Sequence, residues 1–286
     1  MLSFAAPIPR IAAGDEKNAG AHVDCSFSVS ESHTMNFIKE GQGPVVVLSH
    51  ALALDRGMWS DVAAALAPHC TVVRFDLRGH GETTRAIDPF SIEDLADDAA
   101  DLIREVSSDP VVFVGLSLGG MVGQALAARH PVLLRGVAVL NSAAHYPDRS
   151  TWDARILAVR EGGMQAVADS SIARWLTPAF RQTPEGQAMA DRLREVLLRT
   201  HPLAYTRTCE AIAGMDLRPG NRRIDIPTLI VAGRQDMATS LAMSQAMAKD
   251  ITSAQVVEVE AAHISAAEIP GELAVLLDDW IRTLPA

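Results

Sequence analysis

A short segment around Ser117 constrains this chain more than any other. The mostly apolar residues 110–114 lead into Gly115-Leu116-Ser117-Leu118-Gly119, and a helix-forming run then continues to Pro131. This order predicts a buried strand, a tight turn and a helix. The turn would strain the serine backbone, and glycine fits on either side because it has no Cβ. Ser117 would then stand at the positive end of a helix, where negative charge is stabilised.

The rest of the chain alternates strand and helix patterns, which is typical of an α/β protein with a mostly parallel central sheet flanked by helices. Ser91 with Asp94 three residues later is a capping-box pattern that predicts a helix start. Alternating polar and apolar residues predict an antiparallel edge hairpin at 22–30 and 34–40. Apolar runs predict buried strands at 45–49, 71–76, 134–140, 226–232 and 255–260, and helical patterns occupy 59–67 and the stretch after Pro270.

The pattern changes between residues 144 and 224, where helical segments follow one another with no strand pattern between them. We interpret this region as a helical lid inserted into a core formed by residues 22–143 and 225–286. It holds 12 arginines and no lysine against 9 acidic residues, a net charge of +3, so the rest of the chain carries −13. Residues 1–21 are rich in Ala, Pro and Gly and are interpreted as a loose leader.

Composition excludes several classes of protein. The 286 residues suit one large domain with an insertion, and the net charge of −10 argues against a nucleic-acid partner. Cys25, Cys70 and Cys209 show no Cys-x-x-Cys spacing, so we expect reduced thiols, no disulfide framework and no metal site. No uncharged apolar stretch reaches 18 residues and the N-terminus lacks a basic region, so we expect a cytoplasmic protein without a membrane segment.

The Ser117 segment resembles the nucleophile elbow of α/β-hydrolases. In that fold the catalytic partners come in the order Ser, Asp or Glu, His, each on a loop after a strand. Asp236 follows the strand at 226–232, and His263 follows the strand at 255–260. A serine hydroxyl needs an adjacent base to take its proton, and the base needs an anion to orient it. We therefore predict a catalytic triad of Ser117, His263 and Asp236, whereas His80 is predicted to pack within a loop.

A tetrahedral intermediate on Ser117 would need backbone N–H donors for its oxyanion. One should be the amide of Leu118, directly after the nucleophile. The second should come from the loop after the strand at 45–49, and by position we assign it to Leu52.

The sequence also resembles the 3-oxoadipate enol-lactonases of aromatic catabolism from about Thr34 to the C-terminus. The resemblance rests on residues 152–156, 159–164, 174–181 and 261–265, beside motifs shared by many α/β-hydrolases at 74–81, 115–120 and 232–236. It implies a cofactor-free serine hydrolase that opens a small lactone through an acyl-enzyme. His145 stands where the resemblance leads us to expect an arginine, a candidate partner for the substrate carboxylate.

Because such a lactone is anionic, we expect a cation beside it. The candidates are His145, Arg155 and Arg160, in a pocket walled by Trp152. Three alternatives remain open at this point. A broad carboxylesterase or a perhydrolase-like enzyme would use the same fold, and a ligand-binding receptor on that fold would bind without turnover.

Overall fold

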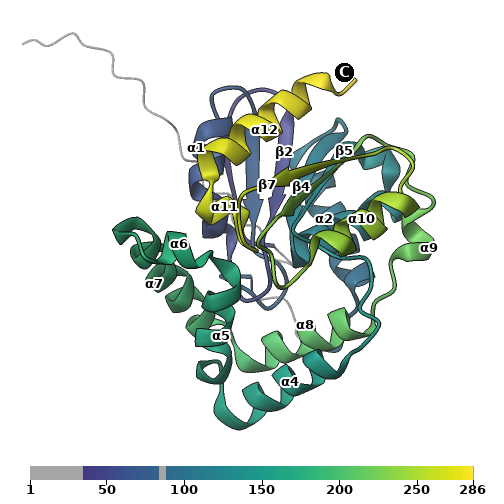
Figure 1. Ribbon diagram of the computed structural model, residues 1–286. Helices are drawn as coiled ribbons and strands as arrows, with labels where there is room; N and C mark the ends of the chain where they lie inside the picture. Colours follow the sequence, from purple (N-terminus) through teal and green to yellow (C-terminus); the bar gives the residue numbers. More distant parts are fainter. Residues whose placement is uncertain (1–34, 84–87, 286) are drawn as a thin grey trace, which may run out of the picture. The chain divides into compact units, whose positions relative to one another are not determined.

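The computed structural model describes residues 35–83 and 88–285, and Figure 1 shows how their elements are arranged. A seven-stranded sheet has the order β1-β3-β2-β4-β5-β6-β7. Strand β1 pairs antiparallel with β3, and every other neighbouring pair among these strands is parallel. The predicted mostly parallel sheet is therefore confirmed. The strands are β1 (Phe37–Gly41), β2 (Val45–Ser49), β3 (Thr71–Phe75), β4 (Val111–Leu116), β5 (Leu134–Leu140), β6 (Thr228–Gly233) and β7 (Ala254–Val259).

Two groups of helices flank the sheet (Figure 1). Helix α1 (Ser60–Leu66) packs against α12 (Pro270–Thr283), with the short α11 (Ser265–Glu268) beside them. The second group contains α2 (Ile92–Val106), α3 (Leu118–Arg129), α9 (Arg218–Asn221) and α10 (Leu241–Asp250). Such helices connect parallel strands and cover the apolar sheet, whose central strands are buried on both faces.

Local sequence signals explain where the elements begin. Ser91 caps α2 in the predicted capping box, because its hydroxyl accepts from the Asp94 amide and the Asp94 carboxylate accepts from the Ser91 amide. The helix predicted at 59–67 begins one residue later, at Ser60. The preceding residues instead form a 3₁₀ turn, η1 (Arg56–Trp59), whose first amides are capped by Asp55.

Between β5 and β6 lies a helical insertion, for which we keep the predicted bounds 144–224. Figure 1 shows the helices of this insertion that precede α9 gathered at one end of the sheet, with α4 and α8 side by side. Its helices before α9 are α4 (Ser150–Gly162), α5 (Gln165–Trp175), α6 (Pro178–Arg181), α7 (Pro184–Arg199) and α8 (Pro202–Gly214). That this insertion acts as a lid stays a prediction. The predicted leader at 1–21 and the first half of the hairpin, at 22–30, lie outside the described residues.

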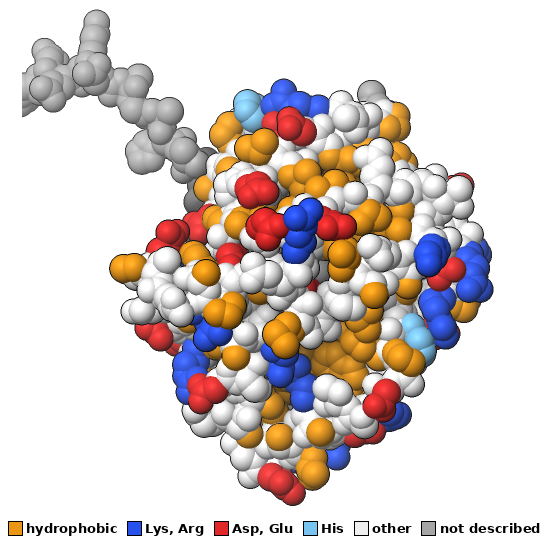
Figure 2. Space-filling model, viewed as in Figure 1, with side chains coloured by type: hydrophobic (Ala, Val, Ile, Leu, Met, Phe, Trp, Pro, Cys, Tyr) orange, Lys and Arg blue, Asp and Glu red, His pale blue; other side chains and the backbone are white. Residues whose placement is uncertain are grey.

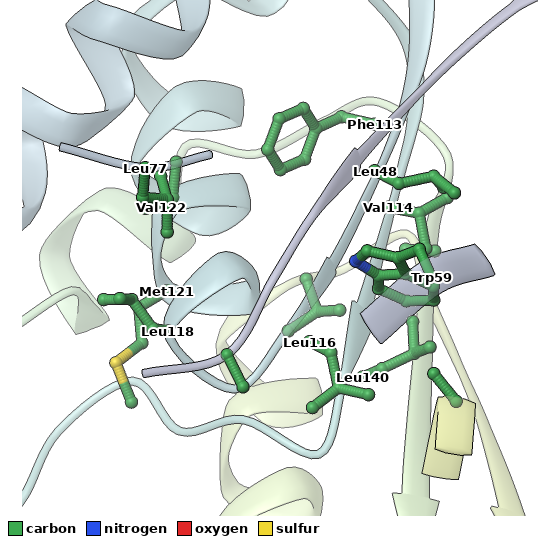
Figure 3. Packing of buried hydrophobic residues seen from close by; sticks show 14 of the residues in the cluster. Leu48, Trp59, Leu77, Phe113, Val114, Leu116, Leu118, Met121, Val122 and Leu140 are labelled. Atoms are coloured by element: carbon green, nitrogen blue, oxygen red, sulfur yellow. The ribbon is translucent and has the colours of Figure 1, made fainter. Parts of the chain in front are cut away.

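The hydrophobic core lies between the sheet and its helices. Figure 3 shows Trp59 close to Leu48 and Val114, and Leu118, Met121 and Val122 of α3 on the other side of the view. These side chains are almost completely buried, as are Cys70 and Cys209. On α12 the predicted burial of Leu273, Leu277, Trp280 and Ile281 is confirmed, whereas Leu276 is only partly buried.

The surface carries charges of both signs, and Figure 2 shows basic and acidic side chains interspersed on one face. Many of them form exposed ion pairs, such as Arg149 with Asp153 and Arg282 with Asp278. Within residues 35–83 and 88–285, no helix is long and apolar enough to cross a bilayer.

Candidate active site

The backbone at Ser117 is strained, as the sequence predicts for a tight turn between β4 and α3. Its φ is 56° and its ψ −111°, a backbone conformation that residues other than glycine rarely adopt. A Cβ on Gly115 would lie 2.0 Å from the Gly119 carbonyl oxygen, and one on Gly119 would lie 2.2 Å from the Ser49 carbonyl oxygen. Glycine is therefore needed at both positions. The turn is held by the Ser117 amide, which donates to the Leu140 carbonyl at 2.9 Å.

The three residues predicted as a triad lie together at the carboxyl ends of their strands. His263 Nε2 is 2.9 Å from Ser117 Oγ, and His263 Nδ1 is 2.8 Å from Asp236 Oδ2. Ser117 is 8% exposed and His263 4% exposed, and both residues line the pocket described below. In this geometry Asp236 accepts a hydrogen bond from Nδ1–H of His263, which leaves Nε2 free to take the proton of the serine hydroxyl.

The Asp236 carboxylate is held in its charged form. Burial acts to raise its pKa, but charge and hydrogen bonding from His263, together with hydrogen bonds from Thr239, outweigh burial and lower the pKa to about 2. Thr239 donates both its hydroxyl, at 2.7 Å, and its amide, at 2.9 Å. Asp236 therefore remains an anion at any pH at which the protein is assayed, and it can orient a protonated His263.

Asn141, which sequence reasoning missed, links the triad loops. It follows β5 with a φ of 46°, a left-handed conformation that asparagine tolerates better than most side chains. Its Nδ2 donates to Asp236 Oδ2 and to the Ala262 carbonyl, both at 3.1 Å, and its Oδ1 accepts from the Ser265 hydroxyl at 2.7 Å. The available signal was a polar residue directly after a buried strand, in the same sheet as the Ser117 strand.

An oxyanion donor must be a backbone amide that does not already donate to another protein group, and both predicted donors meet this requirement. Leu118 is the first residue of α3, so its amide has no carbonyl within the helix. Across residues 35–83 and 88–285, neither the Leu118 amide nor the Leu52 amide donates to a protein acceptor. Leu52 lines the same pocket as Ser117. The loop that carries Leu52 is joined to α3 by the Gly119 amide, which donates to the His50 carbonyl at 3.1 Å.

Ser117 opens into a cavity of about 370 Å³ between the core and the helical insertion. Trp152 and Arg155 lie on its wall, in keeping with their predicted place near the substrate. Sequence reasoning missed Tyr146, Arg174 and Trp175, although residues 174–181 belong to the segments that carry the family resemblance. The lining residues are Ala51, Leu52, Ser117, Tyr146, Asp148, Thr151, Trp152, Arg155, Arg174, Trp175, Ile212, Met237, Ala238, Ser240, Met243 and His263.

The two pocket arginines have no acidic partner within residues 35–83 and 88–285. Arg155 donates to the Tyr205 hydroxyl at 3.0 Å and to the Ser171 hydroxyl at 3.1 Å, and its guanidinium lies 5.6 Å from the centre of the Trp152 ring. Arg174 makes one long contact, 3.5 Å to the Ser170 hydroxyl. Burial lowers the pKa of Arg174, and the nearby charge of Arg155 lowers it further. An arginine nevertheless remains charged at neutral pH, so the pocket wall carries two positive charges.

His145 and Arg160 are not on this wall. His145 pairs with Asp216 in an isolated antiparallel bridge, and its Nδ1 lies 3.4 Å from the Met215 carbonyl oxygen. Arg160 is 60% exposed on α4 and forms an ion pair with Glu210 at 2.8 Å. The difference follows from helical spacing, because Arg155 and Arg160 are five residues apart and face different sides of α4.

His50 and His80 are buried structural residues. Burial lowers the pKa of His50 to about 4, and burial with the neighbouring His50 lowers the pKa of His80 to about 3. His50 Nε2 accepts from the Leu77 amide at 2.9 Å, so the ring proton is on Nδ1, which donates to the Ala51 carbonyl at 2.8 Å. The predicted packing role of His80 agrees with its burial. Within the described residues, no group of three or more His, Cys, Asp or Glu side chains could hold a metal ion.

Comparisons with known proteins show the family to which the chain belongs. Residues 44–268 match the α/β hydrolase fold family. The chain is 34% identical over 239 residues to 3-oxoadipate enol-lactonase 2 of Acinetobacter baylyi, with 82% of this chain and 88% of that protein covered. It superimposes on the crystal structure of the enol-lactonase from Burkholderia xenovorans LB400 with a TM-score of 0.83 and 34% identity, covering 87% of this chain and 96% of the other. A malate-bound thermophilic esterase from Thermogutta terrifontis gives a TM-score of 0.80 at 27% identity, covering 87% and 93%.

Proposed function

We propose that this chain, which belongs to the α/β-hydrolase fold family, opens a small anionic lactone through an acyl-enzyme on Ser117. It is a carboxylic ester hydrolase that resembles 3-oxoadipate enol-lactonases. The proposal rests above all on the continuous contact from Ser117 Oγ through His263 to Asp236. Ser117 and His263 line a pocket whose wall holds two arginines without acidic partners in the described part of the chain.

In the first half of the reaction, Ser117 Oγ attacks the lactone carbonyl carbon while His263 Nε2 takes the hydroxyl proton. The resulting oxyanion would accept from the amides of Leu118 and Leu52. The imidazolium formed on His263 is stabilised by the Asp236 carboxylate. When the intermediate collapses, the ring C–O bond breaks and the ring oxygen leaves, taking the proton from His263. An enolate leaves more readily than an alkoxide because an enol is a stronger acid than an alcohol, so this step needs less help from protonated His263.

In the second half, water hydrolyses the acyl-enzyme. His263 takes a proton from the water, whose oxygen attacks the acyl carbon, and the same amides hold the second oxyanion. Collapse breaks the bond to Ser117 Oγ, which regains its proton from His263. The product is a carboxylic acid that ionises at neutral pH, so an anionic lactone yields a dicarboxylate.

The choice of an anionic substrate follows from the pocket wall. Arg155 and Arg174 are positive, partly buried and without acidic partners in the described part of the chain. A carboxylate that enters the pocket can accept hydrogen bonds from one or both guanidinium groups. The Trp152 and Trp175 side chains supply apolar wall on which the body of a small lactone can pack.

A turnover panel tests the proposal. It contains a carboxylate-bearing enol-lactone, a saturated lactone with the same carboxylate, a neutral lactone and a p-nitrophenyl ester. We expect the highest kcat/KM on the enol-lactone, since it combines the anionic group with the best leaving group. The assignment would be contradicted if kcat/KM depended neither on the substrate carboxylate nor on the acidity of the leaving group.

A broad carboxylesterase is the second candidate, and the similarity to the Thermogutta terrifontis esterase favours it. Such an enzyme would use the same triad but would not discriminate between anionic and neutral acyl groups. In the panel it would turn over the p-nitrophenyl ester at least as well as the anionic lactones.

A further inference from the structure

The helical insertion is bonded directly to the loop that carries His263. Residues 174–177, which we call the wall segment, comprise the last two residues of α5 and the two that follow, and they include the pocket residues Arg174 and Trp175. The Trp175 carbonyl accepts from the Ile264 amide at 2.9 Å. One backbone hydrogen bond therefore joins the pocket wall to the residue immediately after the catalytic histidine.

Glu268 makes the second connection, to the residue immediately before that histidine. Its carboxylate accepts from the Ala262 amide at 2.9 Å. The same carboxylate accepts from the Thr177 amide at 3.3 Å and makes a shorter hydrogen bond with the Thr177 hydroxyl. Thr177 and Ala262 are both buried, so water competes little for these donors.

The carboxylate of Glu268 is suited to this bridge. A carboxylate accepts several hydrogen bonds, and those it accepts in its charged form are stronger than bonds between neutral groups. Glu268 has no ion-pair partner within residues 35–83 and 88–285, so its bonds to Ala262 and Thr177 are the contacts that the structure records for its side chain. The residue lies at the end of the short helix α11, outside the pocket lining.

We propose that Glu268 is a positioning residue that ties the wall segment to the loop of His263, so that the pocket wall and the catalytic base hold one common position. The inference rests on the triad of the proposed function. It adds that the alignment of His263 with Ser117 depends on a contact with the insertion, through a residue that touches neither substrate nor reacting atoms.

The first test replaces Glu268 by glutamine, which keeps the size but replaces one acceptor oxygen by a donor NH₂ group. The readout is the second-order rate at which a fluorophosphonate labels Ser117, because this reaction needs the base but no lactone. We expect Glu268→Gln to slow labelling about tenfold or more, as small misplacements of a catalytic group do. The matched control is Glu272→Gln on α12, which removes an exposed carboxylate that makes no hydrogen bond with its side chain within residues 35–83 and 88–285.

The second test addresses the partner on the insertion. Thr177→Val removes the hydroxyl that Glu268 binds, and Thr177→Ser keeps it, so valine should slow labelling and serine should restore the rate. Thr177 also caps α6 by accepting from the Phe180 amide at 3.2 Å. Thr183→Val is the control for that cap, since Thr183 caps α7 with a similar bond and does not contact Glu268.

Combining the variants separates a shared bridge from two unrelated effects. Glu268→Gln with Thr177→Val should slow labelling no more than Glu268→Gln alone, because both remove the same contact. The imidazole NMR signals of His263 should shift in Glu268→Gln and stay unchanged in Glu272→Gln. This readout requires no activity, so it distinguishes failure of the bridge from failure of the proposed reaction. Wild-type labelling and unchanged signals in Glu268→Gln, or additive effects in the double variant, would overturn the inference.

Discussion

Neutralising Arg174 gives the most direct measure of charge selection in the pocket. Arg174→Gln removes a positive charge from the wall, yet the only hydrogen bond recorded for that side chain in the described part of the chain is the 3.5 Å contact to Ser170. Little internal structure is therefore lost with the charge. Arg155 is a poorer choice for this test, because it also bonds Tyr205 and Ser171 and stacks over Trp152. Arg155→Gln should weaken the pocket for every substrate.

The expected size follows from the contact that is removed. A hydrogen bond to a charged group contributes about 1.5–3 kcal/mol, and 1.4 kcal/mol is a factor of ten in affinity. Arg155 remains beside the carboxylate in the variant, so we expect the lower part of this range. KM for an anionic lactone should rise about tenfold, with kcat changed by less than about threefold, because the contact holds ground state and transition state alike.

The assay compares an anionic lactone with a neutral p-nitrophenyl ester on the same preparations. The neutral ester should keep its KM in Arg174→Gln, since it offers the guanidinium no charge. Arg160→Gln is the matched control, as Arg160 is exposed, paired with Glu210 and outside the pocket. If KM rises equally for both substrates, or does not rise for the anionic lactone, the pocket does not select for an anion and the enzyme is a general esterase.

Three further expectations follow from the site. Ser117→Ala should lower kcat about 10³-fold or more without loss of fold, and a fluorophosphonate should label the wild type at that serine alone. Asp236→Asn should lower kcat to a similar degree and leave KM nearly unchanged, whereas an unaffected kcat would assign the acid elsewhere. His50 is neutral in the fold with a pKa near 4, while its unfolded form takes a proton below about 6.5. Burial of neutral His50 should therefore contribute about 3 kcal/mol to the fall in the free energy of unfolding as pH drops from 6.5 to 4, and urea titrations should show a smaller fall in His50→Gln.

The fold could be predicted because strand, turn and helix signals in this chain agree with one another. The bounds expected for β2 and β5 match those observed, and the capping box at Ser91 forms as expected. The predicted triad could be assigned because each residue follows a strand, and parallel strands bring their carboxyl ends to the same edge of a sheet. Sequence spacing is enough where the backbone alone decides the position.

Residues that contribute through tertiary contacts could not be predicted in the same way. Arg174 and Arg160 look alike in the sequence, and only the packing of α5 against α4 puts the first on the pocket wall and the second in solvent. Asn141 bonds Ala262, which is 121 residues away, and Glu268 bonds Thr177, which is 91 residues away, through side-chain hydrogen bonds that have no sequence motif. Their partners are fixed by the folded chain and leave no periodic pattern.

Under the proposed function, charge selection would operate at contact distance rather than by attraction from afar. The chain carries −10 overall, so its general field repels the anionic lactone proposed as substrate. At physiological ionic strength that repulsion extends only about 8 Å from exposed charges, whereas charges in a partly buried pocket are screened much less. In the proposed function Arg155 and Arg174 would therefore act after the substrate has entered, and both come from the helical insertion. The predicted triad residues follow strands of the sheet, so substitutions of a few residues in the insertion can change which substrate binds without altering the triad.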